Sequence, residues 1–292
     1  MTEQDCKQDD LQKKNGCPLC PRQCGVDRSR FAGRCKVGSR VKLARAALHF
    51  WEEPCISGES GSGTVFFSGC PLGCVFCQNY PISAQGFGKE VSIERLSEIF
   101  LELQEQGANN INLVTGGHFV PQIVQALDLV RGKLTIPVVY NSSGYETVQT
   151  LRLLKGYVDI YLPDLKYFSS ERSERYSHAP DYFAVASQAV REMFSQVGAV
   201  RFDSNGMLQK GMIVRHMVMP DGAEDSMDIL TWIVENLPLD DILVSVMSQY
   251  TPFYQSENYP EINRRLNQKE YDRVLDWMDC MGIENGFVQE LS

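Results

Sequence analysis

Short apolar runs alternate with amphipathic segments along most of this 292-residue chain, and the alternation limits its fold more than any other feature. Apolar runs bounded by turn residues are typical of buried strands, and apolar residues every three or four positions are typical of helices. The clearest helix is predicted at 93–106, where Ser92 can cap the first turn and Gly107 can end the last. Strands are predicted at 64–68, 111–115, 136–140, 158–162, 212–218 and 242–247, and further helices at 120–132, 145–155, 181–197, 226–236 and 268–281.

A series of strand-then-helix units predicts a parallel sheet with helices outside it. Right-handed connections curl such a sheet toward a barrel, and six units are fewer than the eight of a closed one. The fold class is therefore predicted as α/β, a partial (β/α)6 TIM-like barrel with a small cysteine-rich N-terminal extension. We expect an open side, which suits a large protein substrate. The predicted parts are a disordered tail at 1–15, a cysteine-rich metal-binding segment at 16–45 and the barrel at 46–292.

Three cysteines follow the first predicted strand in a C-x3-C-x2-C spacing: Cys70, Cys74 and Cys77. Three thiolates can hold three irons of a cubane cluster, whose full complement is four cysteines. The fourth iron is then left without a local protein ligand, and an open metal position is typical of reactive sites. Buried thiols and a zinc site are the alternatives, although zinc sites more often show two separate C-x2-C pairs. The spacing therefore predicts a reactive iron–sulfur cluster.

A second set of cysteines lies in the predicted N-terminal segment: Cys17, Cys20, Cys24 and Cys35. Four thiolates close a coordination shell, so this site is predicted to be structural or electron-carrying. A four-cysteine zinc site and a second [4Fe–4S] cluster fit the spacing equally well, and unligated thiols are the third alternative. Because most of the cysteines fall into these two sets, the chain is predicted to bind metal in a reducing compartment, the cytoplasm.

Charge and hydropathy exclude several classes of partner. The formal net charge is −9 and no long basic run is present, so nucleic acid is not an expected partner. The first residues are polar and no apolar stretch approaches about 18 residues, so neither a secretory signal nor a membrane span is predicted.

Polar or turn-forming groups stand at the end of each predicted strand, where parallel barrels carry their reactive residues. After the cysteines, these groups are 115–118 (Thr-Gly-Gly-His), 141–144 (Asn-Ser-Ser-Gly), 163–166 (Pro-Asp-Leu-Lys), Arg215 with His216, and 248–252. The alternation of the strand points His216 outward, toward the helices. Arg215 lies within an apolar strand, and a buried charge of this kind needs a partner. His49 is predicted to be a surface or packing residue.

In the cysteine spacing and these strand ends, the chain resembles radical S-adenosylmethionine (SAM) enzymes over roughly residues 45–255. More narrowly it is similar to the activating enzymes of glycyl radical enzymes such as pyruvate formate-lyase, closest to the uncharacterised relatives with a cysteine-rich N-terminal extension. The resemblance implies that Cys70, Cys74 and Cys77 are the catalytic cysteines that hold a [4Fe–4S] cluster. This cluster would cleave SAM reductively to methionine and a 5′-deoxyadenosyl radical.

Partners also follow from the resemblance. It implies a reductant such as flavodoxin or ferredoxin, and a glycyl radical enzyme as the protein substrate. A radical SAM enzyme that acts on a small molecule or another protein is one alternative. A non-catalytic Fe–S or zinc protein is another, and a hydrolase that uses zinc-bound water is the weakest, since the chain has four histidines and no H-E-x-x-H motif.

The resemblance further implies which residues contact SAM. Phe76 would meet the adenine, Gly116 and Gly117 would receive the amino group, and Asn141 and Ser143 would lie near the ribose. Glycine suits the close approach of backbone to a ligand, and asparagine and serine suit hydroxyl groups.

Charged residues would complete this set. Lys166 would lie near the SAM carboxylate, Asp164 on the substrate side, and Arg215 near the methionine or ribose. His118 stands where the family has a glutamate. A neutral histidine or a backbone carbonyl would then accept the hydrogen bond of the amino group.

Overall fold

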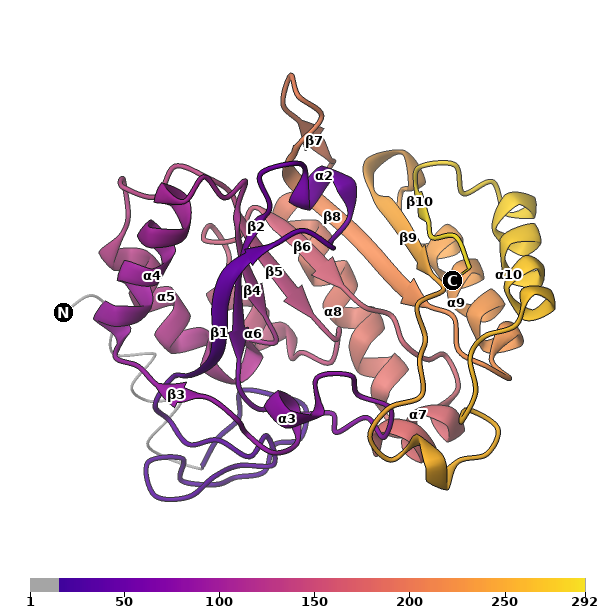
Figure 1. Ribbon diagram of the computed structural model, residues 1–292, viewed down its shortest axis with the longest axis horizontal. Coiled ribbons are helices and arrows are strands. Elements are labelled where there is room, and N and C mark those ends of the chain that lie inside the picture. Colours follow the sequence, from indigo (N-terminus) through magenta and orange to yellow (C-terminus); the bar gives the residue numbers. More distant parts are fainter. Residues whose placement is uncertain (1–15, 292) are drawn as a thin grey trace.

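The computed structural model describes residues 16–291, so the predicted tail at 1–15 lies outside the described residues. Its strands form one open sheet in the order β10-β9-β8-β6-β5-β4-β2-β1-β3, with β7 paired to β8. The helices follow the outside of this sheet, from α4 on the left of Figure 1 to α10 on the right. The predicted α/β fold, a partial TIM-like barrel, is confirmed, and the sheet is not closed.

The central strands run parallel, and each lies within a few residues of its predicted position. Their inward and outward side chains are both buried, as expected for strands covered on two faces. These strands are β2 (Ser62–Phe67), β4 (Ile111–Val114), β5 (Val138–Ser142), β6 (Ile160–Pro163), β8 (Leu208–Met217) and β9 (Leu243–Met247).

The predicted helices are also present. Ser92 accepts a hydrogen bond from the Arg95 amide at the start of α4, and Gly107 follows its end with φ 86°. None of the helices in residues 16–291 is long and apolar enough to cross a membrane. The helices are α4 (Ile93–Glu105), α5 (Val120–Leu129), α6 (Val148–Leu153), α8 (Tyr182–Val197), α9 (Ala223–Asn236) and α10 (Gln268–Cys280).

Strand β1 (Lys42–His49) is the main element that the sequence did not predict. It pairs antiparallel with β2, so it belongs to the sheet and crosses the predicted boundary at residue 45. Its pattern of alternating small, charged and leucine residues gives no clear strand signal, and the pairing with β2 decides its conformation. The other unpredicted elements are β3 (Lys89–Glu90), β7 (Arg201–Phe202), β10 (Gly286–Val288), α2 (Pro54–Ser57), α3 (Tyr80–Ser83), α7 (Ser170–Ser177), η1 (Gly117–Phe119), η2 (Leu239–Asp241) and η3 (Ser256–Asn258).

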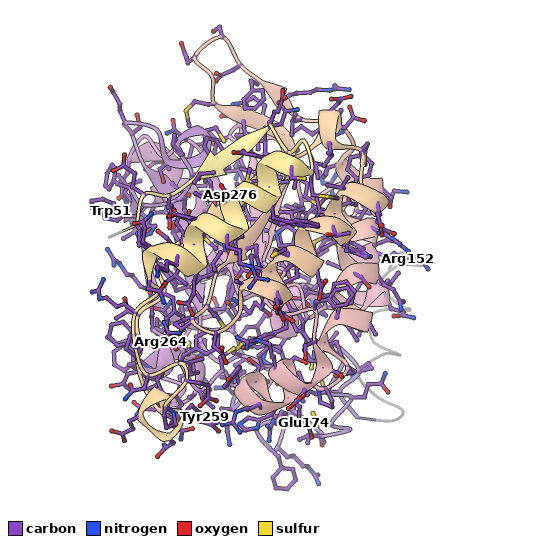
Figure 2. All side chains as sticks on the ribbon, turned by 90° about the vertical axis from the view of Figure 1, so that its right-hand side faces the viewer. Trp51, Arg152, Glu174, Tyr259, Arg264 and Asp276 are labelled. Carbon is purple, nitrogen blue, oxygen red and sulfur yellow. The ribbon has the colours of Figure 1, made fainter. Side chains whose placement is uncertain are left out.

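The N-terminal segment, residues 16–41, contains no helix or strand and lies at the carboxyl ends of the parallel strands, at the bottom of Figure 1. It packs on the barrel through Cys35, Val37 and Val41, which join the main hydrophobic core. The view in Figure 2 looks onto α10, and Trp51 lies at the edge of the molecule there. Because Cys70, Cys74 and Cys77 follow the carboxyl end of β2, both cysteine sets lie at this end of the sheet.

Candidate active site

The cysteine loop, residues 68–79, connects β2 to α3 and places Cys70, Cys74 and Cys77 on the wall of one pocket. Ser177 Oγ donates a hydrogen bond to Cys74 Sγ at 3.0 Å, and Cys77 Sγ lies 3.2 Å from Ser83 Oγ. Burial raises the pKa of the Cys70 thiol to about 12 and also raises that of Cys74. A bound metal would reverse this effect, because metal-coordinated thiols are deprotonated.

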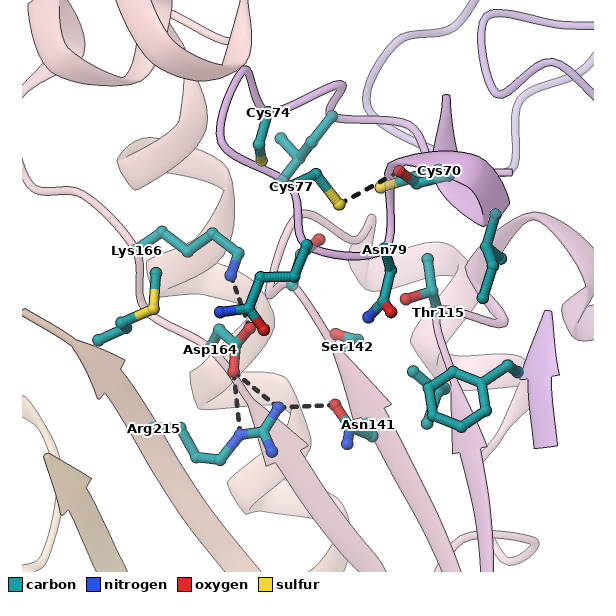
Figure 3. A pocket seen from close by; sticks show the side chains of 18 of the residues that line it. Cys70, Cys74, Cys77, Asn79, Thr115, Asn141, Ser142, Asp164, Lys166 and Arg215 are labelled. Atoms are coloured by element: carbon teal, nitrogen blue, oxygen red, sulfur yellow. Dashed lines mark hydrogen bonds and ion pairs between the residues drawn. The ribbon is translucent and has the colours of Figure 1, made fainter. Parts of the chain in front are cut away.

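The pocket has a volume of about 540 Å³, which is in the range of small-molecule sites. Figure 3 shows the three cysteines on one side of it and the ends of the parallel strands on the other. The strand-end residues that line it include Thr115, Asn141, Ser142, Ser143, Asp164, Lys166 and Arg215.

A network of charged side chains forms the wall opposite the cysteines (Figure 3). Arg215 reaches Asp164 with Nε at 2.9 Å and Nη2 at 2.8 Å, and Nη1 lies 2.9 Å from Glu52 Oε2. Its Nη2 also donates to Asn141 Oδ1 at 2.7 Å, while Lys166 Nζ lies 2.7 Å from Asp164 Oδ2. Two carboxylates thus face two cations, and the predicted need of Arg215 for a partner is met.

The pKa values of this network follow from burial and from the neighbouring charges. Burial alone would raise the pKa of Asp164, but the charges of Arg215 and Lys166 hold it below its usual value. Burial alone would lower the pKa of Lys166, but the carboxylate of Asp164, and then Cys74, raise it. Burial raises the pKa of Glu52 despite the opposing charge of Arg215. Asp164 and Lys166 therefore carry their charges at neutral pH.

The pocket brings together most of the residues predicted to contact SAM. Phe76 is buried in its wall, and its ring centroid lies 5.6 Å from that of Tyr250. Asn141, Ser143, Asp164, Lys166 and Arg215 line the same pocket. Their roles toward SAM remain predictions.

Gly116, Gly117 and His118 are not among the residues that line the pocket, and the 3-10 turn η1 begins at Gly117. His118 is buried with Nε2 2.8 Å from the Ser68 carbonyl oxygen, and burial lowers its pKa to about 3. A Cβ atom on Gly117 would approach Glu146 rather than the pocket. His118 is therefore neutral at pH 7, and it is not among the residues that line the pocket. Thr115 is the residue of this turn that lines the pocket.

Other pocket residues were missed by the sequence reasoning. Glu52, Arg45 and Trp51 come from β1 and the segment after it, which was predicted as a connection. His49, predicted to be a surface or packing residue, also lines the pocket. The buried charge of Arg215 signalled that an acidic partner was needed, but nothing in the sequence singled out Glu52. His216 is directed outward as predicted and contacts Ser226 of α9 through Nε2, at 2.8 Å.

The N-terminal cysteines approach one another in the folded chain. Cys24 Sγ and Cys35 Sγ both lie 3.4 Å from the position that a Cβ atom would take on Gly33. Burial is the main cause that raises the pKa of Cys20 to about 12, and Cys35 and Cys17 are close enough to contribute to this rise. Within residues 16–291, neither cysteine set already has its side chains in a metal-ligand arrangement.

Residues 64–199 match the family model of the radical SAM superfamily. "Uncharacterized protein MJ0674" of Methanocaldococcus jannaschii is 33% identical over 279 residues, which cover 92% of this chain and 75% of that protein. The chain belongs to the radical SAM superfamily. Membership implies a [4Fe–4S] cluster and SAM. The pocket fits both groups, since it combines three thiols with buried cationic and anionic side chains.

Solved structures resemble this radical SAM protein in fold. Streptococcus suis SuiB bound to S-adenosylmethionine superposes with a TM-score of 0.51 at 14% identity, over 76% of this chain and 48% of SuiB. A mutant of spore photoproduct lyase gives a TM-score of 0.53 at 10% identity, over 85% of this chain and 81% of the lyase. The chain thus spans about half the length of SuiB. At these identities the likeness shows the fold alone.

Proposed function

We propose that this radical SAM enzyme holds its [4Fe–4S] cluster on Cys70, Cys74 and Cys77 and binds SAM in the adjoining pocket. The observation that carries the proposal is that the three thiols share one pocket with the Asp164–Lys166–Arg215 network. When bound, the cluster and SAM supply a 5′-deoxyadenosyl radical through one-electron reductive cleavage of SAM.

The side chains of the pocket have distinct tasks in this proposal. Lys166 is held by Asp164 beside Cys74 and suits the carboxylate of SAM as a compact positive charge. Phe76 and Tyr250 offer an aromatic wall to the adenine. Arg215 keeps Asp164 ionised and fixes its direction. The burial of these groups excludes water from a reactive radical.

We further propose that the substrate is a glycine-bearing loop of a glycyl radical enzyme. The open sheet supports a protein substrate, as does the aromatic surface at the pocket, where Trp51 is 85% exposed and the adjacent Phe50 is 51% exposed. Exposed aromatic side chains of this size are typical of interaction surfaces. Another protein or a small molecule is the alternative substrate, and the electron would come from flavodoxin or ferredoxin in a reducing cytoplasm.

The four N-terminal cysteines form a second proposed site, which holds either zinc or another Fe–S cluster. The gathering of Cys17, Cys20, Cys24 and Cys35 in a segment without helix or strand supports it. Such a small segment has little core and needs a staple to fold.

The first experiment is anaerobic reconstitution with iron and sulfide, followed by SAM and dithionite, with 5′-deoxyadenosine measured by mass spectrometry. Wild type and Cys280→Ser, which changes an exposed cysteine outside both sets, should form the product. Cys77→Ser should form none. A wild-type protein with a complete cluster and no 5′-deoxyadenosine would overturn the proposal.

Substrate identity needs a separate measurement. A partner enzyme that co-purifies with the chain should develop a glycyl radical signal in electron paramagnetic resonance (EPR) when SAM and reductant are added. Formation of 5′-deoxyadenosine without a radical signal on the partner would contradict the glycyl radical proposal and favour the alternative substrates.

A further inference from the structure

Arg22 connects the N-terminal segment to the cysteine loop. Its Nε donates to the Pro71 carbonyl oxygen at 2.8 Å, and its Nη2 donates to that of Leu72 at 3.1 Å. Both carbonyls lie between the first two cysteines of the loop. The guanidinium therefore holds the backbone that sets the spacing of these two cysteines.

The other N–H groups of Arg22 reach the end of helix α7. Nη2 donates to the Ser177 carbonyl oxygen at 3.1 Å, and Nη1 donates to that of His178. A cation is favoured there, because the carbonyls at the end of a helix carry partial negative charge. Ser177 itself donates its hydroxyl to Cys74 Sγ. Arg22 thus connects the cysteine loop to α7, the helix whose Ser177 contacts Cys74.

The N-terminal segment also contacts the beginning of the cysteine loop. Gly69, directly before Cys70, has φ 87°, and a Cβ atom there would come within 2.3 Å of the Cys35 carbonyl oxygen. Val37 packs against the same glycine. Both contacts come from the cysteine-bearing segment, so the arrangement of that segment sets the shape of the loop from two sides.

Arg22 lies between two of the N-terminal cysteines, Cys20 and Cys24, in the sequence. A tight turn, in which the Gln23 amide donates to the Cys20 carbonyl oxygen at 3.0 Å, presents the side chain, and the guanidinium carbon lies 5.2 Å from the ring centre of Tyr145. Metal ligation would add folding free energy to a segment that contains no helix or strand. We propose that metal bound by the four N-terminal cysteines fixes Arg22, and that Arg22 braces the cysteine loop in the shape that accepts its cluster. This inference rests on the proposed function.

The brace makes Arg22 a positioning residue, and two substitutions test it. Arg22→Ala removes all four hydrogen bonds of the guanidinium and should lower the initial rate of 5′-deoxyadenosine formation by about tenfold or more, since one hydrogen bond of a charged group already corresponds to about that factor. The variant should also hold less iron than wild type. The change that SAM causes in the EPR signal of its reduced cluster should differ from the change seen in wild type. Arg22→Lys keeps the charge without the fork and should restore part of both. Arg30→Ala, in an exposed position of the same segment, is the matched control and should behave as wild type.

The dependence on the N-terminal metal is tested in two further variants. The double change Cys17→Ser and Cys20→Ser should remove the N-terminal metal and reproduce the loss seen with Arg22→Ala. In a chain whose three loop cysteines are changed to alanine, metal analysis counts the N-terminal site alone, and adding Arg22→Ala should leave that count unchanged. Circular dichroism of each variant identifies those that fail to fold. If Arg22→Ala fails to fold, the rate and iron occupancy of the folded Arg22→Lys variant test the brace instead.

Separate results overturn the inference and the proposed function. If wild type cleaves SAM and Arg22→Ala or the double cysteine variant cleaves it equally fast, the brace is wrong and the proposed function stands. If wild type with a complete cluster does not cleave SAM, the proposed function fails and the inference fails with it. If Arg22→Ala removes the N-terminal metal, the order of dependence is the reverse of the one proposed.

Discussion

Replacing Arg215 with methionine should destabilise the protein by an amount that depends on pH. Its side chain is 12% exposed and pairs with Glu52 at 2.9 Å and with Asp164 at 2.8 Å, which are 10% and 17% exposed. Removing one partner from a buried ion pair costs about 3–5 kcal/mol, because a charge is left buried without compensation. Lys166 still pairs with Asp164. We therefore expect the lower end, about 3 kcal/mol at pH 7.

The pH dependence follows from the direction of the pKa shifts. Although burial opposes it, Arg215 with Lys166 lowers the pKa of Asp164, so this carboxyl stabilises the fold above its unfolded pKa of about 3.9. That stability is lost as pH falls through the folded value. In the Met variant the contribution of Arg215 is absent, and the buried carboxyls protonate at higher pH. The difference between the two proteins should therefore be largest at pH 7 and shrink toward pH 4.

Urea unfolding of the metal-free proteins, followed by circular dichroism at pH 7 and at pH 4.5, measures this difference. Arg273→Met is the matched control, because Arg273 pairs with Glu224 at 3.2 Å on the exposed surface, and its midpoint should hardly change. A Met variant of Arg215 as stable as this control at pH 7 would refute the reasoning. A loss of stability in the Arg215→Met variant that is equal at pH 7 and pH 4.5 would also refute it.

Two other substitutions test the surroundings of the pocket. Burial raises the pKa of Glu146 to about 8, and its Oε2 has no hydrogen-bond partner within residues 16–291. A group with a raised pKa contributes stability that is fully present below its unfolded pKa and is lost as pH rises through the folded pKa, here about 8. The urea midpoint of wild type should therefore fall relative to that of Glu146→Gln between pH 6 and pH 9. A difference between the two midpoints that stays constant over this range would contradict the prediction. Gly144→Ala places a Cβ 2.5 Å from the Asp164 carbonyl oxygen, whereas Gly156→Ala meets nothing within 4 Å, and both glycines have positive φ. Gly144→Ala should therefore lose more than the roughly 1–2 kcal/mol of backbone strain expected for Gly156→Ala, and should bind SAM more weakly in calorimetry; equal losses would show that the clash relaxes.

Much of the barrel could be predicted, because its strands and helices carry periodic patterns that are local in sequence. The capping box at the start of α10 is an example, since Asn267 and Glu270 exchange hydrogen bonds as their spacing predicts. Strand β1 could not be predicted in the same way. Its residues adopt strand conformation because β2 offers them a partner, and that partner is separated from them by a turn and helix α2.

The candidate site could also be predicted only in part. The cysteine spacing and the polar strand ends are properties of the sequence alone, and they were enough to indicate an open iron site among Asp164, Lys166 and Arg215. That His118 does not line the pocket was decided by the turn η1, which no spacing rule describes. The sequence therefore determined the chemical types in the site, and the fold determined which of them face it.

Only the tertiary structure joined residues that are distant in sequence. Glu52 meets Arg215 across 163 positions, and Arg22 meets the end of α7 across 155 positions. A local pattern cannot specify such pairs, because each partner is chosen by the curvature of the sheet and by the need of a buried charge for compensation. The sequence by itself determined that this chain builds a cysteine loop at the end of a parallel strand. The tertiary structure decided that a charged network faces this loop from one side and the cysteine-bearing segment supports it from the other.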